Sequence, residues 1–166
     1  LRLTEDKVKD LLRAANIAVP QGDVASTPEG AARIAADWSD GAVVKALIPT
    51  GRRGKAGAIR IADDASHAAA AAREILGSTA NGYPVKSFYV ERRIDIIREL
   101  YLAFYLEDFP PKVLVSAIGG VDIEDVHRNN PGEVISADID PLRGLPIWDA
   151  MALWEQTSLE RKLLPA

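Results

Sequence analysis

The sequence has 166 residues, of which 48% are hydrophobic and 27% charged, as in a globular chain able to form one domain or two small lobes. With no cysteine and two histidines, it excludes disulfides and thiol chemistry within this stretch, and a His- or Cys-ligated metal site is not expected. A net charge of −4 argues against a dedicated nucleic-acid-binding protein. Because we see no bilayer-length apolar run and no signal sequence, we expect a cytoplasmic location.

The first 50 residues alternate between helices and strands. Thr4 is a capping residue followed by two acids, and Val8, Leu11, Leu12 and Ala15 then fall on one face of an expected helix. A short strand is expected at residues 23–26. The sequence TPE, which begins at Thr27, predicts the start of a second helix. The apolar run at residues 42–48 predicts a buried strand.

The rest of the chain mixes further strands and helices. A glycine-rich segment at residues 50–57 leads to a strand at 58–62 and an alanine-rich helix at 63–76. Runs of β-branched and aromatic residues predict strands at 85–92, 98–107, 112–117 and 134–137. A short helix is expected at 121–127, and one or two helices after Ile147. Because consecutive strands are expected to pair antiparallel among helices, the sequence predicts an α+β fold.

Lys45 lies within the apolar strand at residues 42–48, which is an unusual position for a charged side chain. Strand alternation places Val43 on its face and Val44 and Ala46 on the other. Because removing an ammonium group from water is costly, this group must reach the strand edge, a carboxylate or a bound anion. The alternative is a surface lysine whose stem lies on apolar residues while its head stays in water.

The segment GRRGKAG at residues 51–57 concentrates positive charge in an otherwise acidic chain. Its cations are Arg52, Arg53 and Lys55. Glycines let the backbone turn tightly and approach a ligand, while amides and cationic side chains suit phosphate oxygens. The segment fits neither the Walker-A nor the dinucleotide pattern. A basic surface hairpin and a phosphate-binding loop both explain it, and its position shortly after Lys45 adds weight to the second interpretation.

Acidic residues offer further candidates. Glu91 lies where a buried strand emerges, and a carboxylate there can accept hydrogen bonds from a ribose or a backbone amide. Asp95 is interpreted as a solvated charge at a strand end. Three acids of the helix expected at 121–127 either cap it or help to hold a divalent cation, and capping is favoured. These acids are Asp122, Glu124 and Asp125.

Nine short motifs occur in an order that is characteristic of one superfamily. They are LTEDKVKDLL at 3–12, VPQG at 19–22, TPE at 27–29, VVKA at 43–46, GRRGKAG at 51–57, VER at 90–92, RELYLA at 98–103, GGVDIE at 119–124 and IDPLRGL at 139–145. In this order they resemble the ATP-grasp part of acid–thiol ligases, namely succinyl-CoA synthetase β subunits, malate–CoA ligase and ATP-citrate lyase. The resemblance covers nearly the whole chain.

The resemblance implies an ATP-grasp fold, in which two α+β lobes with mixed or antiparallel sheets hold the nucleotide between them. Residues 1–166 would form the nucleotide-binding region. Within it, residues 20–100 would be the small lobe, and 1–19 and 101–166 would belong to the larger lobe. The family's magnesium-binding Asn and Asp come after the end of this sequence. We therefore expect the fold to be incomplete at its C-terminus, with no metal ligand in this chain.

Matching positions imply that the chain binds ATP and contains no catalytic residue. Lys45 would contact the phosphates, and a loop containing Arg52, Arg53 and Gly54 would cover them. Family chemistry transfers a phosphoryl group from ATP to a histidine and then to the acid, usually with Mg²⁺, before CoA displaces the acyl phosphate. Lys45 and Arg53 are suited to spreading charge over the transferred oxygens.

Other matching positions imply the nucleoside side of the pocket. Glu91 and Ile94 would line the ribose and adenine, and Glu99 would complete the pocket. Pro20 would lie near the base, where proline resembles members that use ATP rather than GTP. Arg52 replaces a glycine of succinyl-type loops and resembles the ATP-citrate lyase version, which points away from succinate.

The resemblance also implies the partners of the chain. The phosphorylated histidine and most of the CoA site belong to an α-type subunit or another domain, and neither His67 nor His127 matches that histidine. These two residues are expected to be ordinary helix or surface residues. A small carboxylic acid and CoA would be substrates, ATP and Mg²⁺ cofactors, and neither nucleic acid nor a membrane a partner. The chain alone would be inactive, and the alternative is a non-catalytic interaction module that has lost turnover.

Overall fold

The computed structural model describes residues 3–50, 53–107, 109–120 and 123–163. The chain divides into two compact units, Leu1–Asp95 and Ile96–Ala166. Each unit combines helices with antiparallel sheet, which confirms the α+β prediction. Among the residues described, no helix is both long and apolar enough to span a bilayer.

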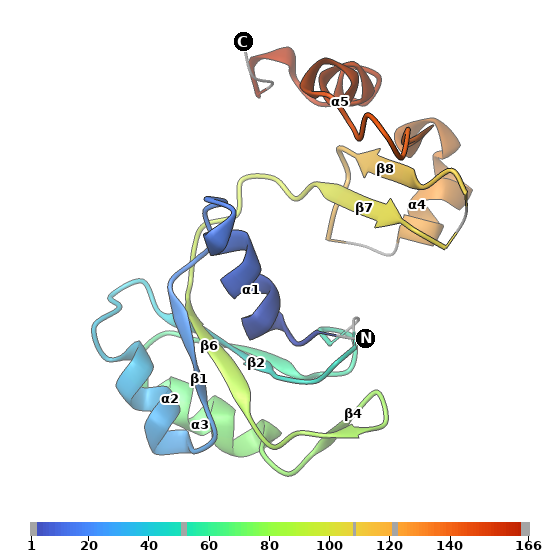
Figure 1. The fold of residues 1–166 in the computed structure, drawn as a ribbon. Helices are drawn as coiled ribbons and strands as arrows, with labels where there is room; N and C mark the ends of the chain where they lie inside the picture. The colour runs from blue at the N-terminus through green and yellow to red at the C-terminus, as the bar shows by residue number, and fades with distance from the viewer. Residues whose placement is uncertain (1–2, 51–52, 108, 121–122, 164–166) are drawn as a thin grey trace. The chain divides into compact units, whose positions relative to one another are not determined.

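The first unit is built on a four-stranded antiparallel sheet with the order β1-β6-β2-β3. Its strands are β1 (Gly22–Ala25), β2 (Ala42–Ala46), β3 (Ile59–Ala62) and β6 (Phe88–Arg92). Its helices are α1 (Glu5–Ala14), α2 (Pro28–Ala35) and α3 (Ala65–Ile75), and a small ribbon pairs β4 (Thr79–Ala80) with β5 (Tyr83–Pro84). Figure 1 shows α2 and α3 on one side of the four-stranded sheet and α1 on the other.

Local capping chemistry explains where the helices begin. The Thr27 hydroxyl oxygen accepts a hydrogen bond from the Gly30 amide at 3.0 Å, which satisfies a free amide at the start of α2. Asp64 caps α3 in the same way, since its carboxylate accepts from the His67 amide at 2.8 Å. Thr4 occupies the N-cap position of α1 as predicted, but its side chain makes no capping hydrogen bond to the backbone.

The strand expected at residues 85–92 is shorter in the structure, where β6 begins at Phe88. The reason lies in the backbone hydrogen bonds of Val85. Its amide donates to the Ser78 carbonyl at 2.8 Å, and its carbonyl accepts from the Gly77 amide at 3.0 Å. These bonds hold Val85 beside the chain that follows α3, so the four-stranded sheet takes up the segment only after it.

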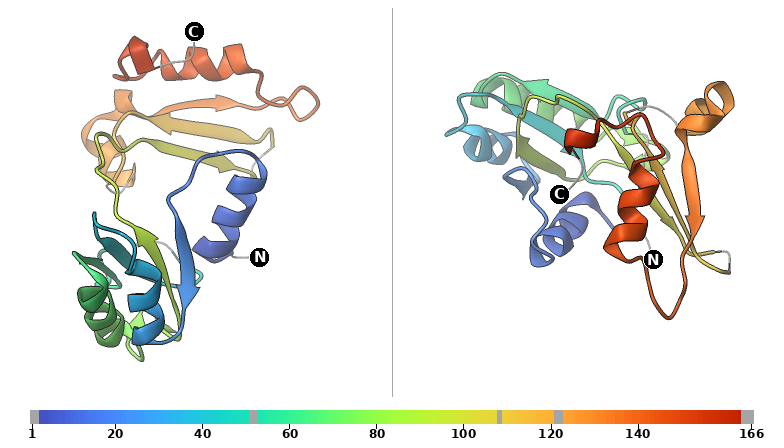
Figure 2. Two further views of the ribbon diagram at one scale, coloured as in Figure 1. Left: turned by 90° about the vertical axis from the view of Figure 1, so that its left-hand side faces the viewer. Right: turned by 90° about the horizontal axis from the view of Figure 1, so that it is seen from above.

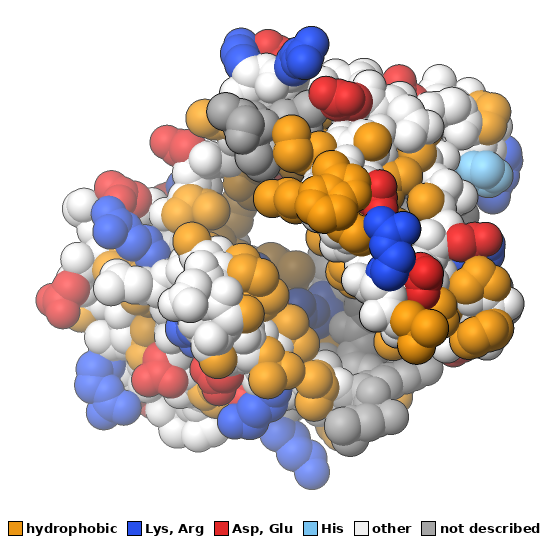
Figure 3. Space-filling view, turned by 45° about the horizontal axis from the view of Figure 1, so that its top comes forward, with side chains coloured by type: hydrophobic (Ala, Val, Ile, Leu, Met, Phe, Trp, Pro, Cys, Tyr) orange, Lys and Arg blue, Asp and Glu red, His pale blue; other side chains and the backbone are white. Residues whose placement is uncertain are grey.

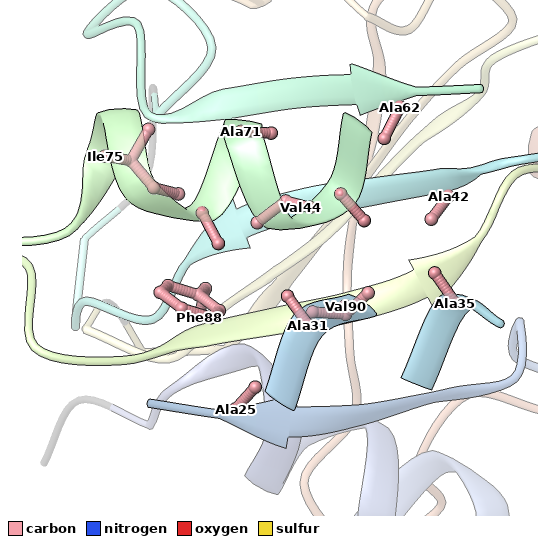
Figure 4. Packing of buried hydrophobic residues seen from close by; sticks show 12 residues of the cluster. Ala25, Ala31, Ala35, Ala42, Val44, Ala62, Ala71, Ile75, Phe88 and Val90 are labelled. Atoms are coloured by element: carbon pink, nitrogen blue, oxygen red, sulfur yellow. The ribbon is translucent and has the colours of Figure 1, made fainter. Parts of the chain in front are cut away.

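Small side chains form the core of the first unit between the sheet and the helices α2 and α3. Val44, Val90 and Phe88 are fully buried on this face of the sheet, and Ala31 of α2 and Ala71 of α3 pack against the same cluster (Figure 4). Alanine on both helices allows their backbones to approach the sheet and each other closely. The face of the sheet that carries Val44 is therefore covered by α2 and α3.

The second unit contains a three-stranded antiparallel sheet with the order β7-β8-β9. Its elements are β7 (Tyr101–Tyr105), β8 (Lys112–Ser116), α4 (Ile123–Asn129), a 3₁₀ turn at Pro131–Glu133, β9 (Ile135–Asp138), α5 (Ile147–Trp154) and a 3₁₀ turn at Arg161–Leu163. Val113 and Val115 of β8 are buried in one cluster with Leu153 of α5. Figure 2 shows α5 along one side of this sheet.

The placement of α1 bears on the predicted lobes. The assignment of residues 1–19 to the larger lobe of a complete ATP-grasp fold stays a prediction. In this chain α1 belongs to the first compact unit. Its Lys9 and Glu5 form ion pairs with side chains on β6 and β2.

Candidate functional site

The space-filling view in Figure 3 shows basic and acidic side chains interspersed on the visible face. Mixed charges of this kind, in a chain with a net charge of −4, produce only a weak field at long range. Local groups of charge therefore decide which ligand the chain attracts.

One such group lies on the face of the four-stranded sheet that points away from α2 and α3. Lys45 of β2 and Glu91 of β6 both project from this face, whereas Val44 projects into the core. Lys45 is directly opposite Tyr89, and Glu91 is directly opposite Val43. Lys45 and Glu91 are thus diagonal neighbours on adjacent strands, within the reach of long side chains.

Among the residues that the structure describes, five charged side chains meet on this face, and we call them the ion cluster. They are Glu5 and Lys9 of α1, Lys45 of β2, Arg53 of the following loop, and Glu91 of β6. The ammonium nitrogens of Lys45 and Lys9 each lie 3.1 Å from Oε1 of Glu5. Both lysines also form ion pairs with Glu91. The partner that Lys45 was expected to need is therefore a pair of carboxylates.

Arg53 reaches the same cluster from the glycine-rich loop. Its guanidinium forms an ion pair with Oε2 of Glu5 and donates a hydrogen bond to the Ala46 carbonyl at 2.9 Å. The loop is itself tied down, since the Arg53 carbonyl accepts from the Ala58 amide at 2.9 Å. Through Glu5, Lys45 and Arg53 are thus held on one side of the molecule. The predicted loop residue Arg52 lies outside the described residues.

The ion cluster is largely removed from water. The side chains of Glu91 and Lys9 are only 8% and 10% exposed, and that of Lys45 is 20% exposed. Three cations face two carboxylates, so the formal charge of the cluster is 3 − 2 = +1. Desolvation offsets much of the attraction in a buried ion pair, so such a cluster is an inefficient way to stabilise a fold. A net positive charge of this kind can attract an anion.

Charge interactions also shift the pKa values of the cluster. Burial raises the pKa of the Glu5 carboxyl, but Lys45, Arg53 and Lys9 together outweigh burial and lower that pKa to about 2. Burial lowers the pKa of the Lys9 ammonium, and Glu5 opposes that change. Glu5 is therefore ionised at neutral pH. Perturbed groups with specific charge partners are common at functional sites.

Tyr89 forms the floor beneath this cluster. The Lys9 ammonium lies 4.6 Å from the centroid of the Tyr89 ring, and Arg13 donates a hydrogen bond to the Tyr89 hydroxyl at 2.9 Å. The absence of a side chain at Gly22 leaves room for the ring. A Cβ at Gly22 would lie 2.7 Å from both a ring carbon of Tyr89 and the Val90 carbonyl oxygen. Gly22 and Tyr89 together set the position of Lys9.

Ile94, predicted on the base side, lies at the end of β6 beside a cavity of about 440 Å³. The cavity is lined by Gln21, Asp40, Arg92, Arg93, Ile94 and Asp95. Gln21 directly follows the predicted base-side residue Pro20, and its carbonyl accepts from the Arg92 amide at 2.8 Å. Ile94 and Gln21, the residue after Pro20, therefore line one cavity beside the strand that carries Glu91.

Glu99 belongs to the second unit, and its part in an ATP pocket stays a prediction. There its carbonyl accepts a hydrogen bond from the Gly119 amide at 2.9 Å. A Cβ at Gly120, where φ is +73°, would overlap the Glu99 carboxylate. The two glycines of the GGVDIE motif thus allow the chain to pass close to Glu99.

The remaining candidates form no second site among the described residues. His67 is an exposed residue of the first turn of α3, with Nδ1 3.0 Å from Asp64, and His127 is an exposed residue of α4, as expected. Asp122 and the side chains of Glu124 and Asp125 lie outside the described part. Where side chains are described, no three of the types His, Cys, Asp and Glu gather as a metal site would require.

The helical pattern of the sequence did not predict that Glu5 and Lys9 belong to the ion cluster. Val8 and Leu11, which the sequence places on one apolar face of α1, are 39% and 60% exposed, while Lys9 is buried. The available signal was the spacing of Glu5 and Lys9, which are four residues apart and therefore adjacent on one helix face.

The first unit thus combines an α+β architecture with a largely buried cluster of cations and carboxylates. A family model described as "ATP-grasp domain" matches residues 2–166, so the chain belongs to the ATP-grasp domain family.

Curated relatives carry the names of CoA ligases. The chain is 36% identical over 168 residues to the succinate–CoA ligase [ADP-forming] subunit beta of Methanothermobacter thermautotrophicus, covering 100% of this chain and 46% of the relative. It is 42% identical over 145 residues to the Rubrobacter xylanophilus subunit of the same name, covering 86% and 38%. A succinate–CoA ligase [GDP-forming] subunit beta from Thermus thermophilus is 36% identical over 165 residues, covering 98% and 44%. The chain thus spans less than half the length of these relatives.

Solved structures share the fold. A dinucleotide-forming acetyl-coenzyme A synthetase 1 from Ca. Korarchaeum cryptofilum aligns with a TM-score of 0.70 and 18% identity, over 95% of this chain and 66% of that chain. ATP citrate lyase from Methanothrix soehngenii aligns with a TM-score of 0.61 and 23% identity, over 87% and 36%. At these identities the likeness establishes the fold alone, and it agrees with the ATP-grasp prediction.

Proposed function

We propose that this chain is the nucleotide-binding part of an ATP-dependent acid–CoA ligase. The observation that carries the proposal is the convergence of Lys45 and Arg53, which share the Glu5 carboxylate on the face of the sheet not used for the core. An ammonium and a guanidinium that can share one carboxylate are also spaced to share a phosphate group. Membership of the ATP-grasp domain family and relatives named succinate–CoA ligase support the same function.

In this proposal Lys45 and Arg53 bind the nucleotide phosphates. Lys45 projects from a strand paired with β3 and β6, so the sheet fixes the base of its side chain, and the carboxylates of Glu5 and Glu91 hold its ammonium. Arg53 is carried by a glycine-containing loop, and Gly54 and Arg52 would complete the cover over the phosphates. Phosphoryl transfer depends chiefly on positioning and on neutralising charge, and these two cations supply both.

The nucleoside would extend toward the end of β6. Glu91 would accept hydrogen bonds from the ribose, and Ile94, with Pro20 nearby, would border the base at the cavity described above. The expected role of Glu99 in completing the nucleotide pocket stays part of the proposal. ATP is the proposed nucleotide, and the GDP-forming name of the Thermus relative makes GTP the natural competitor to test.

The whole protein would couple ATP cleavage to the formation of an acyl-CoA from a small carboxylic acid. We propose that a phosphohistidine on an α-type subunit or domain carries the phosphoryl group, because this chain has no histidine beside its ion cluster in the described residues. Mg²⁺ would neutralise phosphate charge. In the described residues Glu5 and Glu91 are already engaged by cations, so the ligands for Mg²⁺ are proposed to lie elsewhere in the full protein.

An assay of ADP formation tests this function. The full-length protein with its partner subunit would be incubated with ATP, Mg²⁺, CoA and, separately, succinate, malate or citrate. We expect ADP release that requires both CoA and one of the acids. Comparable ADP release with CoA and acid omitted, or none with any acid, would contradict the proposal.

The alternative is a non-catalytic interaction module. It is favoured by one observation: the described cations of the ion cluster are already balanced in large part by Glu5 and Glu91. The same assay separates the two functions, because a module without turnover would leave ADP at background with every acid tested.

A further inference from the structure

The Glu5 carboxylate occupies the position between the two cations to which phosphate binding is assigned. Its Oε1 lies 3.1 Å from the Lys45 ammonium, and its Oε2 is paired with the Arg53 guanidinium. A carboxylate and a phosphate group both present two oxygens to such a pair of donors. Glu5 and a nucleotide phosphate therefore compete for the same two side chains.

We propose that Glu5 is an internal counter-anion that holds Lys45 and Arg53 in place while the site is empty, and that a nucleotide phosphate displaces it. The proposal rests on the assignment of nucleotide binding to these two cations. Glu5 is then a positioning residue rather than a contact of the bound nucleotide.

The two glutamates of the cluster differ in how firmly they are held. Glu91 lies on β6, which is hydrogen-bonded to β1 on one side and β2 on the other. Glu5 lies in the first turn of α1, whose apolar residues Val8 and Leu11 are 39% and 60% exposed. Because these apolar side chains do not enclose the first turn, the Glu5 side chain can rotate out of the ion cluster about its own bonds, while Lys9 keeps α1 in place through Glu91. Glu5 is consequently the exchangeable carboxylate.

The formal charge of the ion cluster also supports this exchange. With both carboxylates in place the cluster has a formal charge of +1. When Glu5 withdraws, Lys9, Lys45 and Arg53 face Glu91 alone, and the charge becomes 3 − 1 = +2. Lys9 keeps its ion pair with Glu91 and its place over Tyr89, so the gain in positive charge falls on Lys45 and Arg53. These two cations are then available to phosphate oxygens.

Inorganic tripolyphosphate is the probe that tests this exchange, because it carries the phosphates without the nucleoside. Its dissociation constant would be measured by calorimetry for the full chain, for Glu5→Gln, and for Asp6→Asn. Asp6→Asn removes the same charge from the same helical turn, but Asp6 pairs with Lys7 at 3.7 Å outside the cluster. We expect Glu5→Gln to bind tripolyphosphate about tenfold more tightly than the unmodified chain, a difference of about 1.4 kcal/mol, with Asp6→Asn unchanged.

A second variant guards against misfolding of Glu5→Gln. Glu5→Asp keeps the charge but shortens the side chain, so its carboxylate cannot span both cations and tripolyphosphate affinity should rise by a smaller factor. Circular dichroism would establish which variants are folded. Equal affinities in the unmodified chain and in a folded Glu5 variant would overturn the inference.

ATP titrations separate this inference from the proposed function. Tighter tripolyphosphate binding by Glu5→Gln without any ATP binding would uphold the counter-anion and refute the nucleotide site. Loss of ATP binding in Lys45→Ala with no gain in Glu5→Gln would uphold the nucleotide site and overturn the counter-anion. Absence of binding of both ligands to every folded variant would refute both.

Discussion

The ammonium nitrogen of Lys45 lies 3.1 Å from Oε1 of Glu5, although 40 residues separate them in the chain. This contact joins the central strand β2 to helix α1, and Arg53 adds a third group to it. The result is a set of cations held on one face of the sheet by carboxylates. The chemistry proposed for the chain, and most of the ways to test it, depend on this arrangement.

Acid should destabilise the first unit through Glu5. The pKa of Glu5 is lowered from its ordinary value of 4.5 to about 2, so this carboxylate contributes stability above pH 4.5 that is lost as the pH falls toward 2. Thermal unfolding of the unmodified chain and of Glu5→Gln would be compared across this range. The stability difference between them should shrink as the pH falls. A difference that stays constant would show that Glu5 is not ion-paired in the folded state.

Removing Glu91 should cost more than removing a carboxylate from an exposed ion pair. Glu91→Gln leaves the two lysines of the buried cluster with only Glu5, and breaking a buried pair costs about 3 kcal/mol. Asp40→Asn is the matched control, because Asp40 pairs with Arg92 at the surface, where ion pairs contribute little to stability. Chemical denaturation gives both values. Equal losses in the free energy of unfolding for the two variants would contradict the burial of the ion cluster.

Adding a methyl group at Gly22 should disturb the floor of the site. The Cβ of Gly22→Ala would lie 2.7 Å from the Tyr89 ring, so either the ring or β1 must move, at a cost of about 1–3 kcal/mol. Gly132→Ala, where nothing lies within 4 Å of an added Cβ, should leave the free energy of unfolding nearly unchanged. Denaturant titration of both variants measures this. A neutral Gly22→Ala would mean that Tyr89 does not lie against this glycine.

Much of the local structure was predictable because it depends on neighbouring residues. The helix cap at Thr27 follows from short-range chemistry, as does the alternation that puts Lys45 and Val44 on different faces of the sheet. Both are confirmed. The need of Lys45 for a partner was also predictable from the cost of burying an ammonium. Which partner it finds, whether the strand edge, a carboxylate or an anion, was not predictable, because that depends on which distant segments pack beside β2.

The parts that sequence reasoning missed are set by long-range packing. Lys9 pairs with Glu91, which is 82 residues away, and no helical periodicity reports such a contact. The apolar stripe of α1 pointed to a different buried face from the one observed, because ion pairs rather than apolar burial attach this helix to the sheet. What stays a prediction is the nucleotide-binding role of every predicted site residue, namely Pro20, Lys45, Arg52, Arg53, Gly54, Glu91, Ile94 and Glu99.

The most direct test of the nucleotide site is the affinity of the full-length protein for ATP with Mg²⁺, measured by calorimetry before and after Lys45→Ala. The control is Arg73→Ala, which removes a positive charge from an exposed ion pair on α3, 3.7 Å from Glu29. Lys45→Ala removes a charge-assisted contact to phosphate, so the account predicts at least about a tenfold loss of affinity, to the point of abolishing measurable binding. Arg73→Ala should bind as the unmodified protein does. Unchanged affinity in a folded Lys45→Ala protein would contradict the account.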